Sequence, residues 1–197
     1  MPEAPWRVVA LLRGVNVGGV KVPMGDLRSM LAREDLGEVR THLQSGNVIV
    51  TSPTSDSGAV AGVIEKAIRE GLGLSIRVIV RDRDQMARTV ASNPFRAPKA
   101  NPTLLHAVFL ESEPAPDRVT SLDPDRSPQD RFCVIGMEIF VHYGPAGSGR
   151  SSLGLSYFEK ILGVTGTARN WNTVTRLHEM LEEGSIPARR RTGSGHP

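Results

Sequence analysis

The sequence predicts an α+β protein made of two ferredoxin-like (split βαβ) halves, joined by a helix and completed by a C-terminal helix. Hydrophobic periodicity gives the order β-α-β-β-α-β in residues 1–82, the first half. A connecting helix and loop occupy residues 83–99, and a similar order of elements returns in residues 100–184, the second half. Residues 185–197 contain three arginines and no acid, and we expect them to form a disordered basic tail.

The first half opens with a strand at Trp6–Leu12. Its side chains are apolar on both faces, so we expect the strand to be covered on both sides. A helix is expected after Pro23, because apolar residues recur at helical spacing from Met24 to Leu31. The other elements expected in this half are strands at Val39–Leu43 and Val48–Thr51, a helix with an apolar stripe from Val60 to Ile68 that ends at Gly71 or Gly73, and a strand at Ile76–Val80.

The connecting helix is expected to begin after Asp82, since Gln85 follows three residues later, and to end at Asn93-Pro94. An apolar stripe that starts at Trp171 predicts the last helix, which ends at Gly184. The elements expected between them are strands at Leu104–Leu110, Arg131–Ile135, Met137–Tyr143 and Val164–Arg169, a short helix at Pro116–Leu122, and a helix marked by Leu155, Phe158 and Leu162.

Composition and charge favour a globular protein of the cytoplasm. Of the 197 residues, 39% are hydrophobic and 23% are charged, which suits a folded domain. No apolar run approaches the roughly 20 residues that span a bilayer, and no secretory signal is visible. The single cysteine, Cys133, favours a reducing compartment. Without the three arginines of the tail, 21 basic and 21 acidic residues balance, so the net charge does not support nucleic-acid binding.

A glycine-bearing turn follows the first strand, from Arg13 to Lys21. Glycine adopts positive φ without strain and Asn tolerates it better than most residues, so we expect the backbone to bend sharply here. In the split βαβ plan this turn and the hairpin Gln44–Asn47 lie at the same end of the sheet, where N–H groups converge on an anion site. The candidate ligand-binding residues of this first cluster are Arg13, Gly14, Asn16, Gly18, Gly19, Lys21, Ser45, Gly46 and Asn47.

A second polar cluster is expected in the second half, where the loop after the third strand, residues 144–152, should lie beside the end of the fourth strand, residues 167–173, and both segments precede helices. Gly144–Ser151 resembles the phosphate-loop pattern G-x-x-x-x-G-K-S, with Arg150 in place of the Lys. Because the strand before it belongs to a hairpin, the pattern favours a looser anion-binding loop over a nucleotide-triphosphate site. The candidate ligand-binding residues here are Arg150, Ser151, Arg169, Asn170, Asn172 and Thr173.

Structural roles are an open alternative for several of these residues. Ser151 or Ser152 suits the N-cap of the following helix, Asn170 or Asn172 suits the cap of the last helix, and Trp171 suits the core. No catalytic residue is assigned, because neither the five histidines nor the carboxylates show the spacing of metal ligands or of an acid–base pair. No metal site is expected, while the cofactor and the question of enzymatic activity stay open.

Three motifs, L-L-R-G-V-N-V-G-G, Q-S-G-N-V and T-A-R-N-W-N-T-V, resemble the DUF1697 family of uncharacterised bacterial proteins. The resemblance runs from about residue 6 to residue 183. It implies a cytoplasmic bacterial α+β protein of similar two-part architecture, without an established activity. It points to residues within 13–19, 45–47 and 169–173, and it supplies no catalytic residue.

Three functions follow as hypotheses. The favoured one is the binding of a small anionic or phosphate-bearing ligand at the glycine-rich loops. The first alternative is nucleic-acid binding, because ferredoxin-like sheets can bind RNA through exposed aromatics, and Phe140 shares a strand face with Glu138 and His142. The second is a non-enzymatic interaction module, in which Phe140 is covered by a partner or by the other half. The sequence does not determine the oligomeric state.

Overall fold

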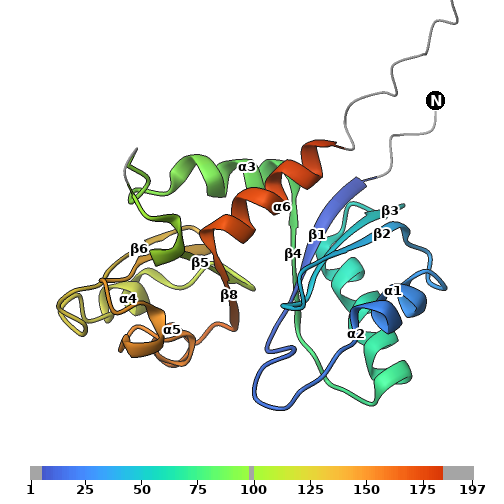
Figure 1. The fold of residues 1–197 in the computed structure, drawn as a ribbon, viewed down its shortest axis with the longest axis horizontal. Helices are drawn as coiled ribbons and strands as arrows, with labels where there is room; N and C mark the ends of the chain where they lie inside the picture. Colours follow the sequence, from blue (N-terminus) through green and yellow to red (C-terminus); the bar gives the residue numbers. More distant parts are fainter. Residues whose placement is uncertain (1–5, 98–99, 184–197) are drawn as a thin grey trace, which may run out of the picture.

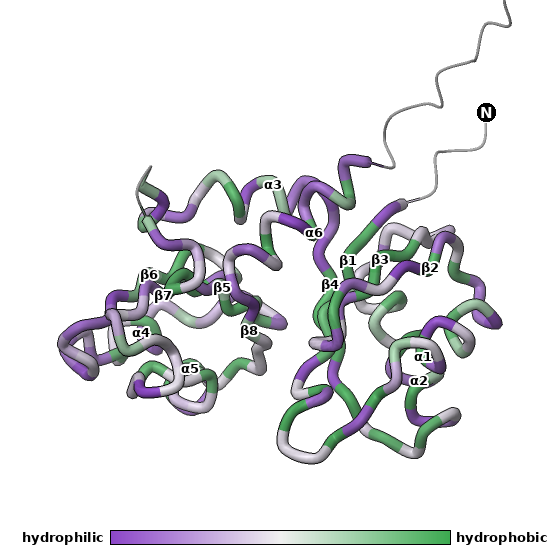
Figure 2. Tube along the Cα trace, in the orientation of Figure 1, coloured by the Kyte–Doolittle hydropathy of each residue, from purple (hydrophilic) through white to green (hydrophobic). Residues whose placement is uncertain are grey.

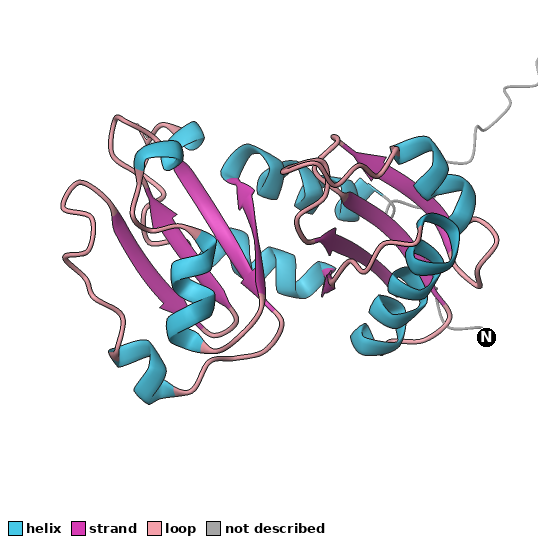
Figure 3. Cartoon of the chain, turned by 90° about the horizontal axis from the view of Figure 1, so that it is seen from below, coloured by secondary structure: helices cyan, strands magenta, loops and turns pink. Residues whose placement is uncertain are grey.

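The computed structural model describes residues 6–97 and 100–183. Within them the chain forms six α-helices and two four-stranded antiparallel sheets, which confirms the predicted α+β class. Figure 1 shows one lobe around each sheet, with α3 (Arg83–Ser92) and α6 (Trp171–Glu183) running across both. Figure 3 shows the sheets as separate blocks of strands. The predicted tail lies outside the described residues, and no helix in the described part is long and apolar enough to cross a bilayer.

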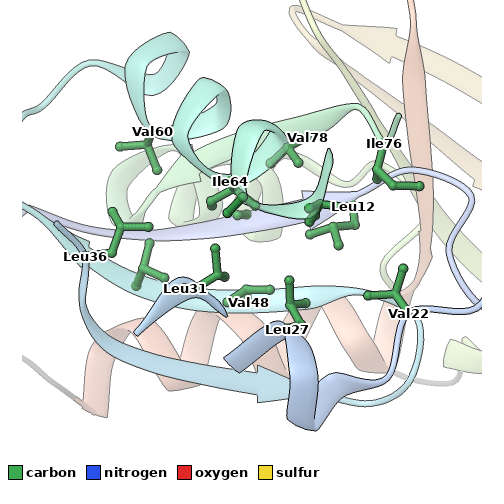
Figure 4. Close-up of a cluster of buried hydrophobic side chains, with 14 of the residues drawn as sticks. Leu12, Val22, Leu27, Leu31, Leu36, Val48, Val60, Ile64, Ile76 and Val78 are labelled. Carbon is green, nitrogen blue, oxygen red and sulfur yellow. The ribbon is translucent and has the colours of Figure 1, made fainter. Parts of the chain in front are cut away.

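The first sheet has the strand order β2-β3-β1-β4, and every neighbouring pair is antiparallel. Helices α1 and α2 cover one face of it, where Leu12, Leu27 and Ile64 belong to a buried apolar cluster (Figure 4). The elements of this half are β1 (Trp6–Leu12), α1 (Met24–Leu31), β2 (Gly37–His42), β3 (Asn47–Ser52), α2 (Ser57–Leu72) and β4 (Val78–Asp82).

Side-chain caps and glycine fix the ends of α2 and α3. The carboxylate of Asp56 accepts hydrogen bonds from the backbone N–H of Gly58, at 2.8 Å, and of Ala59, so α2 begins there. Gly73, with φ of 66°, ends α2. Asp82 and Gln85 bond reciprocally to each other's backbone N–H groups in a capping box, which confirms the predicted start of α3.

The second sheet repeats this arrangement, with the order β6-β7-β5-β8 and antiparallel pairs throughout. Phe158 and Leu162 of α5 pack in a buried cluster on one face of this sheet. The prediction that Ser151 or Ser152 caps this helix is wrong, because α5 begins after Gly154 without a side-chain cap. The elements of this half are β5 (Leu105–Leu110), α4 (Pro116–Thr120), β6 (Arg131–Ile135), β7 (Glu138–His142), α5 (Leu155–Leu162) and β8 (Gly166–Asn170).

The core between the halves is built around α6. Residues from both sheets, from α3 and from α6 form one buried apolar cluster there. Trp171 packs edge-on against Phe140, with ring centroids 6.3 Å apart. β1 is covered on both faces, as predicted: Val8 packs in the cluster under α1 and α2, whereas Val9 and Leu11 pack in the cluster around α6. Figure 2 shows the hydrophobic character of β1 at this central position.

Candidate functional site

The glycine loop (residues 13–21) and the hairpin turn (residues 44–47) lie side by side, as the strand order predicts. The N–H of Leu12 donates to the carbonyl of Gly46 at 2.8 Å. The amide of Asn16 donates to the carbonyl of Gln44 and to that of Val22, and its oxygen accepts from the N–H of Val22 at 3.0 Å. Asn16 therefore holds the loop closed on itself and against the hairpin turn.

Positive φ angles recur through the glycine loop, with 68° at Gly14, 56° at Asn16, 59° at Gly18 and 93° at Gly19. Within the described residues, the backbone N–H groups of Gly18, Gly19 and Lys21 make no hydrogen bond to protein. Residues 16–23 and Gln44 line a shallow depression of about 380 Å³ at this surface. The loop thus presents open N–H groups to solvent.

Arg13 reaches across to the other half. Its Nε and Nη2 atoms donate to the two carboxylate oxygens of Glu159, at 3.0 and 2.8 Å. Glu159 also accepts from the backbone N–H of Gly166 at 2.9 Å. The hydrogen bond with Glu159 raises the pKa of Arg13 above its usual value. Arg13 therefore forms a bidentate salt bridge that links the two halves, and its guanidinium is not free to neutralise an anion.

Arg169 makes the second link, from β8 into the hairpin turn. Its side chain donates to Asn47 Oδ1 at 2.5 Å, to the carbonyl of Leu12 at 2.8 Å and to that of Gly46 at 3.2 Å. Arg169 is 6% exposed and, among the residues that the structure describes, has no carboxylate partner. Burial lowers its pKa to about 10, still far above neutrality, so the guanidinium carries its charge at pH 7.

The two predicted clusters therefore meet only through Arg169, which forms a joint between the halves with Gly46 and Asn47. Asn47 is fully buried and donates to the carbonyl of His42 at 2.8 Å and to Ser45 Oγ at 3.0 Å. A Cβ atom at Gly46 would lie 2.3 Å from Val15 Cγ2. These residues are packed too closely for a ligand to enter between them.

The loop at Gly144–Ser151 is organised around a carboxylate. Asp130 accepts from Ser127 Oγ at 2.5 Å, from Ser151 Oγ at 2.5 Å and from the backbone N–H of Gly144 at 2.7 Å. Burial alone would raise the pKa of Asp130, but these three hydrogen bonds outweigh it and lower the pKa. The donors that Ser127, Ser151 and Gly144 supply are taken by this negative charge, while the exposed Arg150 remains available to contact an anion.

Asn170 caps the last helix, which confirms that structural alternative. Its side-chain oxygen accepts from the backbone N–H of Asn172 at 3.0 Å, and its amide donates to the carbonyl of Thr103 at 3.0 Å. Asn172 is exposed and Thr173 is buried in α6. Trp171, 4% exposed, is a core residue. The start of β5 lies between this segment and the loop at 144–152, because Leu105 pairs with His142 and His106 with Asn170, so the two segments are separated by a strand.

The sheet face that carries Phe140 is closed by the chain itself. Phe140 is 1% exposed and lies in the cluster around α6. An aromatic side chain that stacks on RNA bases must be exposed, so Phe140 cannot bind RNA in this way. Within the described residues, no three His, Cys, Asp or Glu side chains come together as a metal-binding group.

Sequence reasoning missed the acidic partners Glu159 and Asp130. Nothing in the spacing of Glu159 connects it with Arg13, which lies 146 positions away. It also missed the buried Arg81, whose Nε donates to Glu138 Oε1 at 2.8 Å and whose Nη2 donates to the carbonyl of Leu110 at 2.6 Å. The one available signal was an arginine at the end of a buried strand, which requires a partner.

Comparison with known proteins agrees with this architecture. The model of a family described as a protein of unknown function, DUF1697, matches residues 6–140, which include the glycine loop and the hairpin turn but not Arg169. A solved structure of similar fold is that of the conserved bacterial protein SP0830 from Streptococcus pneumoniae. It is 21% identical, covers 91% of this chain and 99% of its own, and has a TM-score of 0.71. This likeness shows the fold alone. No curated protein matches the sequence.

Proposed function

The chain belongs to the DUF1697 family, whose function is unknown, and we propose that it binds a small anionic, phosphate-bearing ligand at the glycine loop. One observation carries the proposal: Gly18, Gly19 and Lys21 line the depression, and their backbone N–H groups make no hydrogen bond to protein within the described residues. Successive N–H groups in a turn of alternating handedness form a concavity that attracts anions. The left-handed residues Asn16, Gly18 and Gly19 give the loop such a turn.

The charge around the depression also favours an anion. Lys21 lines it, is exposed, and makes no ion pair within the described residues. Helix α1 begins three residues later at Met24, and the N-terminal end of a helix carries partial positive charge. Arg13 joins the base of the loop to Glu159 of the other half, and Arg169 of the other half donates to the carbonyl of Leu12, just before the loop. We assign them a supporting role.

We also assign each half to the ferredoxin-like plan, with the first half at 1–82, the connecting helix and loop at 83–99 and the second half at 100–184. The order of elements, β-α-β-β-α-β in both halves, supports this assignment. So does the strand order, in which the first strand of each half lies between the third and the fourth.

Isothermal titration calorimetry tests the ligand. We expect heat of binding with inorganic phosphate, glucose 6-phosphate or ADP, and a loss of about tenfold in affinity in Lys21→Gln, since one charge-assisted hydrogen bond contributes about that factor. Lys66→Gln is the matched control, because Lys66 is exposed on α2 away from the depression and should leave binding unchanged.

Two results overturn the proposal. One is the absence of binding by all three phosphate compounds at millimolar concentration. The other is binding that Lys21→Gln and Lys66→Gln weaken equally, because it would then reflect general attraction to positive charge.

A further inference from the structure

A second cleft, of about 260 Å³, opens between α3 and the turn that joins β6 to β7. It shares no lining residue with the depression at the glycine loop. Its walls come from the connecting helix α3, which follows directly on β4 of the first sheet, and from the second half, to which β6 and β7 belong. The cleft therefore depends on how α3 packs beside the second sheet.

The wall formed by α3 carries hydrogen-bond donors. Gln85, Arg88 and Ser92 lie at spacings of three and four residues and so share one face of the helix. The oxygen of the Gln85 side chain accepts from the N–H of Asp82 at 2.9 Å, which leaves its amide N–H groups to donate elsewhere. Among the described residues, the guanidinium of Arg88 and the hydroxyl of Ser92 have no partner. This wall suits a carboxylate.

The facing wall carries a free carboxylate. Two acids line the cleft, Glu113 and Glu138. Glu138 is occupied, because Arg81 donates to it at 2.8 Å. Glu113 is exposed and makes no ion pair in the part of the chain that the structure describes, and it does not pair with Arg88. One unpaired positive and one unpaired negative charge thus line the same cleft without neutralising each other.

The surface between these charges is apolar. Met137 and Phe140 line the cleft, together with Ile135, which is 40% exposed although isoleucine is among the residues most often buried. A charged ligand without an apolar part would leave this apolar surface exposed to water. A purely apolar ligand leaves both charges unpaired.

We propose that this cleft binds a small zwitterion with an apolar body, of the size and chemistry of an α-amino acid with a branched or thioether side chain. Its carboxylate bonds to Arg88 and to the donors of Gln85 and Ser92, and its ammonium bonds to Glu113. The apolar side chain lies on Met137 and Ile135, since Phe140 is only 1% exposed. A volume of about 260 Å³ admits one such molecule and is smaller than the roughly 300–1,000 Å³ of pockets that hold drug-sized ligands.

Calorimetry with L-leucine and L-methionine on the full chain tests the proposal. We expect saturable binding of at least one of them, and at least tenfold weaker binding of 3-methylbutylamine, which lacks the carboxylate, and of N-acetyl-L-leucine, which lacks the ammonium. Arg88→Gln and Glu113→Gln should each weaken amino-acid binding at least tenfold.

Both substitutions are at exposed positions, so we expect neither to destabilise the protein. An unchanged thermal unfolding midpoint verifies that the variants fold. Arg118→Gln, at an exposed position on α4, is the control for charge and should bind like the parent chain. Lys21→Gln should also bind amino acids normally, which separates this cleft from the glycine loop. The proposal is overturned if neither amino acid binds at millimolar concentration, if N-acetyl-L-leucine binds as well as leucine, or if Arg88→Gln has no effect.

Discussion

Arg169 shows how one side chain joins two parts of a chain. Buried polar groups that lose their partner destabilise the folded state, and Arg169→Met would remove the donors from the carbonyl of Leu12 and from Asn47. We expect the free energy of unfolding to fall by about 3 kcal/mol. Urea denaturation measures it. Arg150→Met, at an exposed position, should change the free energy of unfolding by less than about 0.5 kcal/mol. If the two substitutions destabilise the protein equally, Arg169 does not join the halves.

Two glycines in equivalent backbone conformations differ in what surrounds them. Gly46 and Gly18 both have positive φ, 73° and 59°. A Cβ atom at Gly46 would meet Val15 Cγ2 at 2.3 Å and Leu12 Cβ at 2.8 Å, whereas one at Gly18 would meet nothing within 4 Å. Gly18→Ala should therefore cost only the left-handed backbone strain of about 1 kcal/mol, and Gly46→Ala about 3 kcal/mol or more. Thermal unfolding of both variants tests this order.

Asp130 contributes stability that depends on pH. Its pKa in the folded protein lies below the ordinary value of 3.8, so its hydrogen bonds stabilise the protein above that value, and this contribution is lost as the pH falls through the lowered pKa. Asp130→Asn should destabilise the protein by about 1–3 kcal/mol at pH 7. The difference from the parent chain should shrink towards pH 3 in urea denaturation. If the difference in stability between the parent chain and Asp130→Asn does not change with pH, the ionised carboxylate of Asp130 is not what stabilises the protein.

At the scale of elements, α6 is the helix on which both sheets depend. Leu177 is fully buried in the cluster to which both sheets contribute. Leu177→Ala should reduce the free energy of unfolding by about 2–5 kcal/mol, because it leaves a cavity that neither sheet can fill alone. Glu179→Ala, on the exposed side of the same helix, removes only a surface ion pair with Arg176 and should destabilise the protein far less than Leu177→Ala. Guanidinium denaturation of the two variants provides the comparison.

The helices and strands could be predicted from the sequence because each depends on a pattern of residues within its own segment. The apolar run of Trp6–Leu12, the apolar stripe of α2 and the capping box of Asp82 and Gln85 require only neighbours along the chain. The ends of elements differ from the prediction where tertiary contacts determine them. The predicted strand starts at Ile76, which is buried, whereas β4 begins at Val78. An apolar stripe tells which face of α6 is buried. It does not tell that the face covers two sheets.

The candidate site was predictable to the extent that topology places it. Strand order alone brought the glycine loop to the hairpin turn, as the bond from Leu12 to Gly46 shows. Topology within one half says nothing of the other half. The partners of Arg13 and Arg169 therefore could not be predicted, since each lies more than 100 positions away along the chain. Four residues expected at a ligand, Arg13, Gly46, Asn47 and Arg169, instead connect the two halves.

At the scale of the whole molecule, the two halves should unfold together. Val9 and Ile79 of the first sheet share one buried cluster with Phe109 of the second and with α6. Arg81, 3% exposed, adds an ion pair across the same boundary to Glu138. Neither half can separate without exposing these groups, so the free energy of opening the boundary is comparable to that of unfolding either sheet.

The two tryptophans allow this cooperativity to be measured. Trp6 belongs to β1, and Trp171 begins α6. In Trp6→Phe the fluorescence of Trp171 reports on the boundary, while far-UV circular dichroism reports on all the elements. We expect the two signals to give the same urea midpoint, as a two-state transition requires. If the Trp171 signal changes at a lower urea concentration than the circular dichroism, the halves come apart first, and the boundary is then a hinge rather than a core.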